Sequence, residues 1–429
     1  MIKTVNYGDK ILIYNLNTDA LVAVNNSNIP VEELLKKEEI LKFLKDNLVI
    51  FDKGIDEKKI SKYVLNKSKY GRDQLLITDA SSYKCNLRCV YCMQQNTFKN
   101  VNEINVKERV DIWQNLIEAS GLQSAAVVLF GGEPFLNLNY VNDLLTEATS
   151  RNLPIDHYSA VTNGVNLDEN SVKLLNKFPF SKLQITLDGT EKVHDARRYH
   201  ANKAGSFKTI IANLHTIFDH TKISVIINSV LDKGNLNDYI EMVKFLLKEF
   251  PSEIRTARMI FNVGRECHPA FKSQYTNENI LKEKEYAKVV YDAIDFLIEN
   301  DCEINQLKPS PICMRLSEND IMISPDGSLY KCISGLGMDR FKLISKDKFL
   351  EKPYMYILMQ SQWCEKDVDM ECEKCPYLFL CNGGCEYNAF IQGTKKECNK
   401  EYLSAAIDRL ILAMGKYLER KGELVEWNM

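Results

Sequence analysis

The segment Cys85-Asn-Leu-Arg-Cys89-Val-Tyr-Cys92 places three cysteines in the spacing CxxxCxxC. It comes soon after Leu75-Leu-Ile-Thr78, an apolar run that is typical of a buried strand. Three thiolates on one loop can hold three irons of a [4Fe–4S] cluster, which leaves the fourth iron for a ligand from outside the protein. A zinc site is the alternative, although structural zinc usually takes four protein ligands.

Strand-like and helix-like segments alternate downstream of this loop. The apolar runs predict strands at 75–78, 126–130, 158–162, 183–187, 223–227 and 257–261. Helical spacing of apolar residues predicts helices at 106–119, 138–151, 169–176, 206–219, 236–249 and 278–299. Such βα units in sequence indicate a parallel sheet covered by helices. The pattern leaves open whether the sheet stays open or curls into a barrel.

A second motif, Gly131-Gly132-Glu133-Pro134, stands at the end of the second predicted strand. Paired glycines let a ligand approach the backbone closely, and a carboxylate beside them can accept from a ligand ammonium group. Functional sites of parallel α/β proteins assemble at the carboxyl ends of the strands. Taken alone, the motif could equally be a strand-to-helix turn.

The last third of the chain is rich in cysteine. Seven of its thiols follow the pattern Cx13Gx4C, a gap, Cx2Cx5Cx3C, a second gap and C. Seven thiolates are too many for one metal ion, so they predict two metal sites, with two zinc ions as the physical alternative to two clusters. The residues are Cys313, Cys332, Cys372, Cys375, Cys381, Cys385 and Cys398.

Composition narrows the class of protein. The 429 residues carry a net charge of −3, which gives no general argument for nucleic acid or an anionic membrane as partner. No apolar run approaches the roughly 20 residues that span a bilayer, and residues 1–10 lack the apolar core of a signal peptide. A cytoplasmic location is therefore expected, where the 13 cysteines serve as metal ligands or buried thiols rather than disulfides.

The two ends of the chain predict smaller units. Residues 1–70 read as a small α+β domain, with a hairpin at 10–15 and 20–24 followed by a helix within 31–49. A weaker helix is predicted near 57–65, in a polar stretch where a linker could begin. An amphipathic helix at 401–421 is expected to pack on the surface.

Together the motifs resemble those of the radical S-adenosylmethionine (SAM) enzymes. That family's signature is CxxxCxΦC, in which Φ is aromatic and corresponds here to Tyr91. The resemblance implies a partial (β/α)6 TIM-like barrel over about 75–300, with Cys85, Cys89 and Cys92 on the catalytic cluster. It also implies that SAM is held near Tyr91, Gly131, Gly132, Glu133, Pro134, Asn163, Thr186 and Arg198.

The cysteine-rich tail resembles the SPASM extension of these enzymes, which carries two auxiliary [4Fe–4S] clusters. The resemblance implies that Cys313, Cys332 and Cys385 hold the first cluster, and that Cys372, Cys375, Cys381 and Cys398 hold the second. The first cluster then has three cysteines for four irons. Either Cys364 completes it, another residue does, or one iron stays open for a substrate thiolate.

The resemblance implies four units: a winged-helix-like domain at 1–70, the barrel at 71–304, the SPASM domain at 305–400 and a C-terminal helix at 401–429. Relatives with a SPASM extension mostly modify peptides or proteins. The expected activity is maturation of a ribosomally synthesised precursor peptide, most simply by a cysteine thioether crosslink. The N-terminal domain would bind the leader as an added strand, and a flavodoxin or ferredoxin would supply electrons.

Other functions remain open from the sequence. Sulfatase maturation, which makes formylglycine, is disfavoured because Ile333 follows Cys332 where those enzymes carry Asp, and because about 75 residues precede the barrel. Carbon–carbon crosslinking and epimerisation of a peptide are further alternatives. A non-enzymatic iron–sulfur or zinc protein would have no need of the Gly-Gly-Glu-Pro motif.

Overall fold

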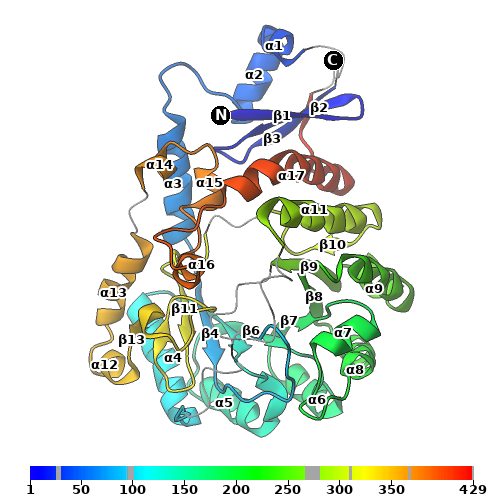
Figure 1. Cartoon of the computed structure of the whole chain (residues 1–429). Coiled ribbons are helices and arrows are strands. Elements are labelled where there is room, and N and C mark those ends of the chain that lie inside the picture. The colour runs from blue at the N-terminus through cyan, green and yellow to red at the C-terminus, as the bar shows by residue number, and fades with distance from the viewer. Residues whose placement is uncertain are drawn as a thin grey trace.

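The computed structural model describes most of the chain as one assembly of a large α/β unit and a small sheet above it (Figure 1). The described residues are 1–25, 30–92, 94, 101–265, 281–308, 312–365 and 369–427.

A series of parallel strands forms the centre of the large unit. Each predicted strand is present, and each pairs in parallel with the next along the chain. Their bounds are β4 Leu75–Ala80, β5 Ala125–Phe130, β6 Ile155–Thr162, β7 Phe180–Thr186, β8 Ser224–Leu231 and β9 Met259–Arg265.

The predicted covering helices are also present, as α4 Val106–Ser120, α5 Leu138–Ser150, α6 Glu169–Lys177, α8 Phe207–His220, α9 Leu236–Glu249 and α11 Glu283–Glu299. Local sequence sets their ends: Asn105 and Glu108 form a reciprocal capping box at the start of α4, and Gly121 ends that helix in the left-handed conformation. Two short helices were not predicted, α7 Glu191–Arg197 and α10 Pro251–Arg255.

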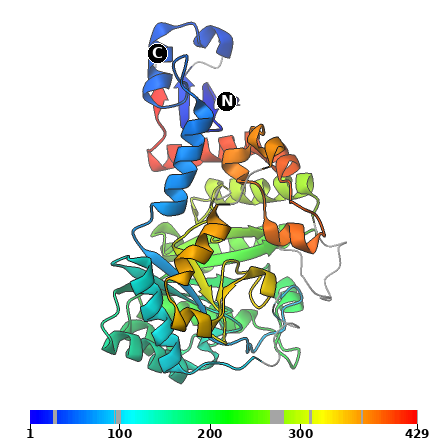
Figure 2. The same ribbon diagram turned by 90° about the vertical axis from the view of Figure 1, so that its left-hand side faces the viewer.

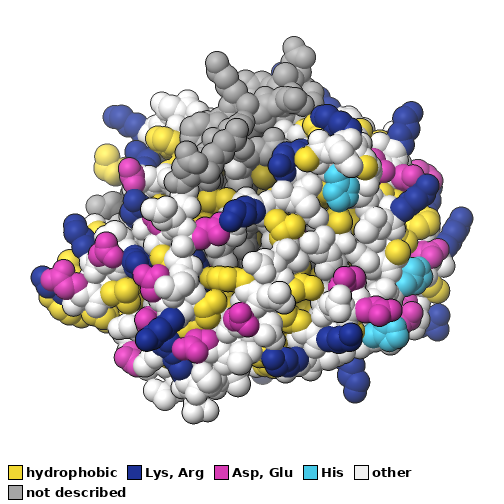
Figure 3. Space-filling model, turned by 90° about the horizontal axis from the view of Figure 1, so that it is seen from below, with side chains coloured by type: hydrophobic (Ala, Val, Ile, Leu, Met, Phe, Trp, Pro, Cys, Tyr) yellow, Lys and Arg dark blue, Asp and Glu magenta, His cyan; other side chains and the backbone are white. Residues whose placement is uncertain are grey.

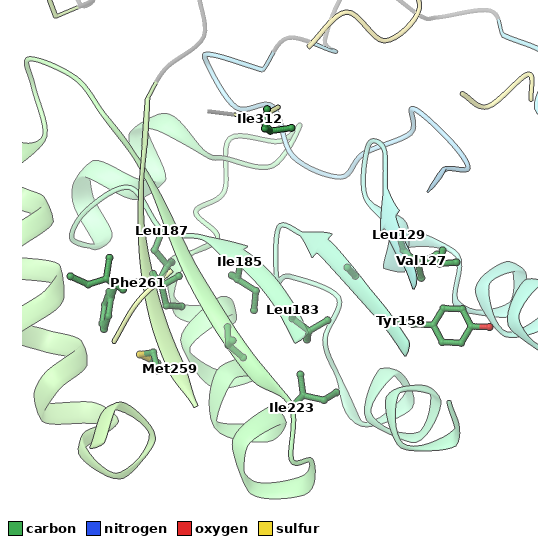
Figure 4. Packing of buried hydrophobic residues seen from close by; sticks show 14 of the residues in the cluster. Val127, Leu129, Tyr158, Leu183, Ile185, Leu187, Ile223, Met259, Phe261 and Ile312 are labelled. Atoms are coloured by element: carbon green, nitrogen blue, oxygen red, sulfur yellow. The ribbon is translucent and has the colours of Figure 1, made fainter. Parts of the chain in front are cut away.

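The core lies between the sheet and its helices. Val127 of β5, Leu183 and Ile185 of β7, and Phe261 of β9 are buried together (Figure 4). The strands are buried on both faces, so apolar side chains occupy neighbouring positions along each strand. For this reason each strand appears in the sequence as a continuous hydrophobic run.

The sheet does not close on itself. Its strand order is β10-β9-β8-β7-β6-β5-β4-β11-β12-β13, so it is an open, parallel-centred sheet with the fold of a partial barrel. The four added strands come from the tail and were not predicted because they are short: β10 Glu303–Ile304, β11 Asp320–Ile323, β12 Leu329–Tyr330 and β13 Lys342–Ile344.

The first part of the tail is therefore built into the main core. β11 pairs in parallel with β4, and Ile321, Ile323 and Leu329 are fully buried in the same cluster as the barrel strands. The rest of the tail consists of short helices: α12 Lys346–Glu351, α13 Met355–Cys364, α14 Met370–Glu373, α15 Leu378–Cys381 and α16 Glu386–Ile391.

The N-terminal domain has a four-stranded sheet in the order β1-β2-β3-β14. The predicted hairpin is confirmed, but a further strand precedes it and a strand from the far end of the chain joins its edge. The helix expected within 31–49 is split in two, and the stretch suspected of being a linker is a capped helix. The bounds are β1 Ile2–Tyr7, β2 Lys10–Asn15, β3 Leu21–Asn25, β14 Glu426–Trp427, α1 Val31–Leu34, α2 Glu38–Asp46 and α3 Glu57–Tyr70.

Helix α17, Lys400–Lys421, lies between the two units (Figures 1 and 2). It packs on α11 and on β1, β2 and β3. Ile407, Leu410 and Ile411 are almost completely buried, so the expected surface position is wrong. The amphipathic pattern predicts a single apolar face, but the helix buries side chains against two different parts of the protein, α11 and the small sheet.

The surface carries no dominant charge on the face seen in Figure 3, where basic and acidic side chains are interspersed. Among the described residues, the helices are all too short or too polar to cross a lipid bilayer.

Candidate active site at the carboxyl ends of the strands

A cavity of about 1200 Å³ opens beside the CxxxCxxC loop. It is bounded by that loop, by the Gly131–Gly132 turn after β5, and by residues near the carboxyl ends of β6, β7 and β8. Of the residues predicted to bind a cluster or SAM in the barrel, it brings together Cys85, Cys89, Tyr91, Cys92, Gly131, Gly132, Asn163, Thr186 and Arg198.

The cysteine loop is fixed by backbone pairing with the segment after α7. Arg88 donates its amide to the Tyr199 carbonyl at 2.7 Å, and Val90 donates to the Arg197 carbonyl at 2.9 Å. The thiols are close enough to act on one another. Burial raises the pKa of Cys89 to about 12, and the neighbouring Cys92 and Cys85 thiolates add to that rise while Arg198 opposes it.

The Gly-Gly-Glu-Pro turn is pressed against the start of the cysteine loop. Gly132 donates to the Ser82 carbonyl and Glu133 donates to the Lys84 carbonyl, each at 2.9 Å. A Cβ on Gly132 would lie 2.1 Å from the Lys84 oxygen, and one on Gly131 would lie 2.3 Å from the Ser82 oxygen. The glycines were predicted to let a ligand approach; in the structure they first let the cysteine loop approach.

The Glu133 carboxylate is buried. It accepts from the Thr162 hydroxyl and the Asn163 backbone amide, both at 2.7 Å, and from the Phe135 amide at 3.0 Å. Burial raises the pKa of this carboxyl, and the three donors oppose the rise. With these donors in place, Glu133 ties the β5 turn to the end of β6. Glu133 and Pro134 line a smaller pocket.

Asn163 connects the β6 end to the first cysteine. Its side-chain amide donates to Asn86 Oδ1 at 2.7 Å and lies 3.7 Å from the Cys85 sulfur. Its own oxygen accepts from the Val165 amide at 2.9 Å. A donor beside a sulfur stabilises the thiolate form, which is the form that binds iron.

Tyr91 lies in a buried network of charges that sequence reasoning only partly identified. Its hydroxyl donates to Asp188 and accepts from Arg198 Nη1 at 2.8 Å. Arg197 stacks over the ring with its Cζ 5.1 Å from the centroid, and also pairs with Asp188 and Asp232. The roles of Asp188 and Arg197 depend on distances across α7 and β8 that no local pattern reveals.

Arg198 has one group left for a ligand. The residue is 8% exposed and lines the cavity, and its Nε has no hydrogen-bond partner among the described residues. A buried guanidinium nitrogen without a partner is costly, so an acceptor from a bound molecule would stabilise it. Gln184, Asn228 and Thr186 line the same cavity; the first two were missed because polar residues within strands carry no motif.

His194, the only histidine in a family motif, packs beneath this network. Its Nε2 is 3.0 Å from the Ser206 hydroxyl, and its Nδ1 accepts from the Asp188 amide at 3.4 Å. Burial lowers its pKa to about 4. The neutral ring supports the turn after β7 and does not line the cavity.

Cys332 and Cys372 are predicted ligands of different clusters. Burial raises the pKa of Cys332 to about 12, and Cys385 and Cys313 add to the rise. Burial also raises the pKa of Cys372, and Lys396 opposes that rise. The two ligand sets stay predictions.

Cys381 belongs to the second predicted set. Burial raises its pKa, and backbone amides of Asn399, Gly384 and Gly383 oppose the rise. A sulfur that accepts from several amides is suited to carry negative charge, as a cluster ligand must. The turn needs glycine, since a Cβ on Gly384 would lie 2.1 Å from the Glu397 carbonyl.

Cys364 is a buried residue at the end of α13. It is 1% exposed, and Lys69 donates to its carbonyl at 3.2 Å. Burial raises the pKa of its thiol, and Lys331, whose ammonium group interacts with both Cys364 and Cys313, opposes the rise. Cys302 is a buried thiol 3.6 Å from the Asn300 carbonyl, as expected, while Cys267 lies outside the described residues.

Comparison with known proteins assigns the class of this domain. A profile of the radical SAM superfamily matches residues 81–246, so the chain contains a radical SAM domain. The match covers the cysteine loop and the strand ends around the cavity.

Particular relatives extend over more of the chain. A cysteine-type anaerobic sulfatase-maturating enzyme of Clostridium novyi (strain NT) is 27% identical over 346 residues, covering 73% of this chain and 88% of its own. The structure of native anSMEcpe with bound AdoMet has a TM-score of 0.63 at 20% identity and covers 82% of this chain and 100% of its own. Streptococcus suis SuiB bound to precursor peptide SuiA has a TM-score of 0.55 at 16% identity, covering 92% and 99%.

A radical SAM domain implies SAM and a [4Fe–4S] cluster, and the residues present fit both. The cysteines that line the cavity supply one thiolate for each of three irons. Arg198, which lines the cavity, would supply guanidinium donors to an anionic or hydroxyl group of SAM. Among the described residues, no three Cys, His, Asp or Glu side chains converge where they could bind one common ion.

Proposed function

We propose that this protein is a radical SAM maturase of a ribosomally synthesised precursor peptide, and that it joins a cysteine sulfur to a carbon of another residue. The observation that carries the proposal is the cavity itself, around which three cysteines predicted as cluster ligands, Arg198 and polar strand-end residues lie. Its volume of about 1200 Å³ is large enough for SAM together with a peptide side chain.

The cofactors would supply the hard chemistry: bound together, the cluster and SAM furnish a 5′-deoxyadenosyl radical that removes a hydrogen atom from an unactivated carbon. The chain's own residues bind and orient. Tyr91 and Arg198 fix the wall next to Cys89, while the Glu133 and Asn163 contacts hold the cysteine loop against the strand ends. Catalysis of this kind depends on positioning more than on proton transfer.

The tail supports the choice of a thioether. We propose that Cys313, Cys332 and Cys385 hold the first auxiliary cluster and that Cys372, Cys375, Cys381 and Cys398 hold the second. We propose that Cys364, which lies at the end of α13 with Lys69 on its carbonyl, is not the fourth ligand, so that one iron of that cluster would remain open. An open iron would offer the substrate thiolate a binding position.

Residues 1–70 are proposed as the leader-binding domain. The support is its sheet, which has edges where an extended peptide can add through backbone hydrogen bonds. A flavodoxin or ferredoxin would supply the electrons.

Formylglycine formation is the second candidate. The relative from Clostridium novyi and the fold likeness to anSMEcpe favour it, whereas Ile333 and the N-terminal domain were the sequence arguments against it. Both reactions oxidise a peptide cysteine, so the product must distinguish them.

The test is incubation of the anaerobically reconstituted protein with SAM, dithionite and each short cysteine-bearing peptide that the open reading frames beside its gene encode. Formation of a thioether removes two hydrogen atoms from the peptide, so the peptide mass falls by the mass of two hydrogens. The cysteine sulfur is then alkylated and no longer reacts with iodoacetamide. Formylglycine replaces the thiol by an aldehyde that reacts with hydrazides. An aldehyde product, or an unchanged peptide despite SAM cleavage, would refute the thioether proposal.

A further inference from the structure

The edge of strand β3 is occupied by a segment from the opposite end of the chain. Strand β14 pairs in parallel with β3, with Glu426 opposite Ala23 and Trp427 opposite Val24. The Ala23 amide also donates to the Val425 carbonyl at 2.9 Å. Two residue pairs of this ladder lie within the described residues, whereas β1 and β2 are paired over six.

The side chains of this segment point alternately to the two faces of the sheet, as in any strand. Glu426 reaches Lys10 of β2 at 2.6 Å, and that lysine also pairs with Glu419 of α17 at 2.5 Å. Trp427 lies on the other face, where its ring is 5.4 Å from that of Phe43 in α2. Val425 beside them is 44% exposed.

These contacts are those of an extended peptide bound at a sheet edge: backbone hydrogen bonds for affinity, and alternate side chains in two chemically different positions for selectivity. One position presents a lysine amine and takes a carboxylate. The other presents an aromatic ring and takes a second ring. The segment is connected to the rest of the chain through α17, so it competes with any external peptide at a high effective concentration.

We infer that the β3 edge, with Lys10 on one side and Phe43 on the other, is a peptide-binding surface selective for an extended segment in which an acidic residue precedes an aromatic one. Residues 425–427 are an internal occupant that such a peptide displaces. The inference rests on the proposed function for the identity of that peptide as a substrate leader. It adds the sequence feature that the leader carries and the segment that it replaces.

Hydrogen–deuterium exchange over residues 21–25 tests the inference, in the full-length protein without SAM or reductant. The Trp427→Ala variant should lose protection there by about tenfold, since the remaining contacts of a two-pair ladder are weak. A synthetic peptide with the sequence of residues 422–429, at about 1 mM to match a tethered segment, should restore it. The same peptide with Ala in place of Trp should not.

Val425→Ala is the matched control, because this half-exposed side chain contributes little and the variant should exchange as the parent does. Equal protection of residues 21–25 in the parent and in Trp427→Ala would overturn the inference, as would failure of the peptide to restore protection. Neither result bears on SAM cleavage, so the proposed function is judged separately: peptide binding without peptide modification would refute that function and leave this surface intact.

Discussion

At the scale of single residues, the account depends on how tightly the cysteine loop is pressed against its neighbours. Gly131 and Gly132 are required by the carbonyls of Ser82 and Lys84 that lie against them. The motif was recognised from the sequence, but its contact with the preceding loop was not, because that contact joins segments about 50 residues apart.

Replacing Gly132 by alanine should separate these segments. The new Cβ would meet the Lys84 oxygen at 2.1 Å, which is backbone and cannot rotate away, so a cost of about 1–3 kcal/mol is expected. Iron bound per chain after reconstitution should fall, together with the melting temperature. Gly234→Ala is the control, because its nearest neighbour would be 3.4 Å away. Equal iron content in both variants would contradict the close packing.

His194 gives a prediction about pH. Its pKa is about 4 when folded and roughly 6.5 when unfolded, so the unfolded chain binds more protons between these values. The neutral ring therefore makes its full contribution to the free energy of unfolding above pH 6.5. This contribution falls by about 2–3 kcal/mol as the pH decreases towards 4. Urea denaturation at several pH values measures the loss. His194→Gln should flatten this part of the profile; an unchanged slope would show that other groups cause it.

At the scale of elements, the sequence predicted the central strands and covering helices well, because their apolar runs reflect burial on both faces. It did not predict β11, β12 and β14, which have two to four residues each and form only because a partner strand is already present. The sequence also did not predict the position of α17, because an amphipathic pattern indicates that one face of a helix is buried but not which element covers that face.

The position of α17 predicts a large effect of Ile411. This side chain is fully buried in the cluster that joins the helix to α11 and the small sheet, so Ile411→Ala should cost about 2–5 kcal/mol of stability. Chemical denaturation followed by circular dichroism measures it. Ser404→Ala, on the exposed side of the same helix, should change little. Comparable losses of stability from the two substitutions would contradict the buried position of α17.

At the scale of the whole molecule, the cysteine ligand sets were predicted from spacing and from the resemblance, and they stay predictions. The role of Cys364 could not be read from spacing, because its neighbours Lys331 and Lys69 come from distant parts of the chain. The proposed open iron predicts that Cys364 is no cluster ligand.

The Cys364→Ala variant should therefore retain the iron content of the parent, about twelve per chain if all three clusters assemble. Its auxiliary-cluster electron paramagnetic resonance spectrum should also be unchanged. Cys332→Ala serves as the comparison, since it removes a proposed ligand and should lower the iron content by up to one cluster. Loss of iron from both variants would make Cys364 the fourth ligand and close the open site.

The central claim is that the cavity at the strand ends carries out radical SAM chemistry. The most direct measurement is release of 5′-deoxyadenosine from SAM by the reduced, reconstituted protein, in the parent and in Cys89→Ala. The account predicts release by the parent and none by the variant, with the auxiliary-cluster signals still present. Zinc in place of iron with no release by the parent, or undiminished release by Cys89→Ala, would contradict it.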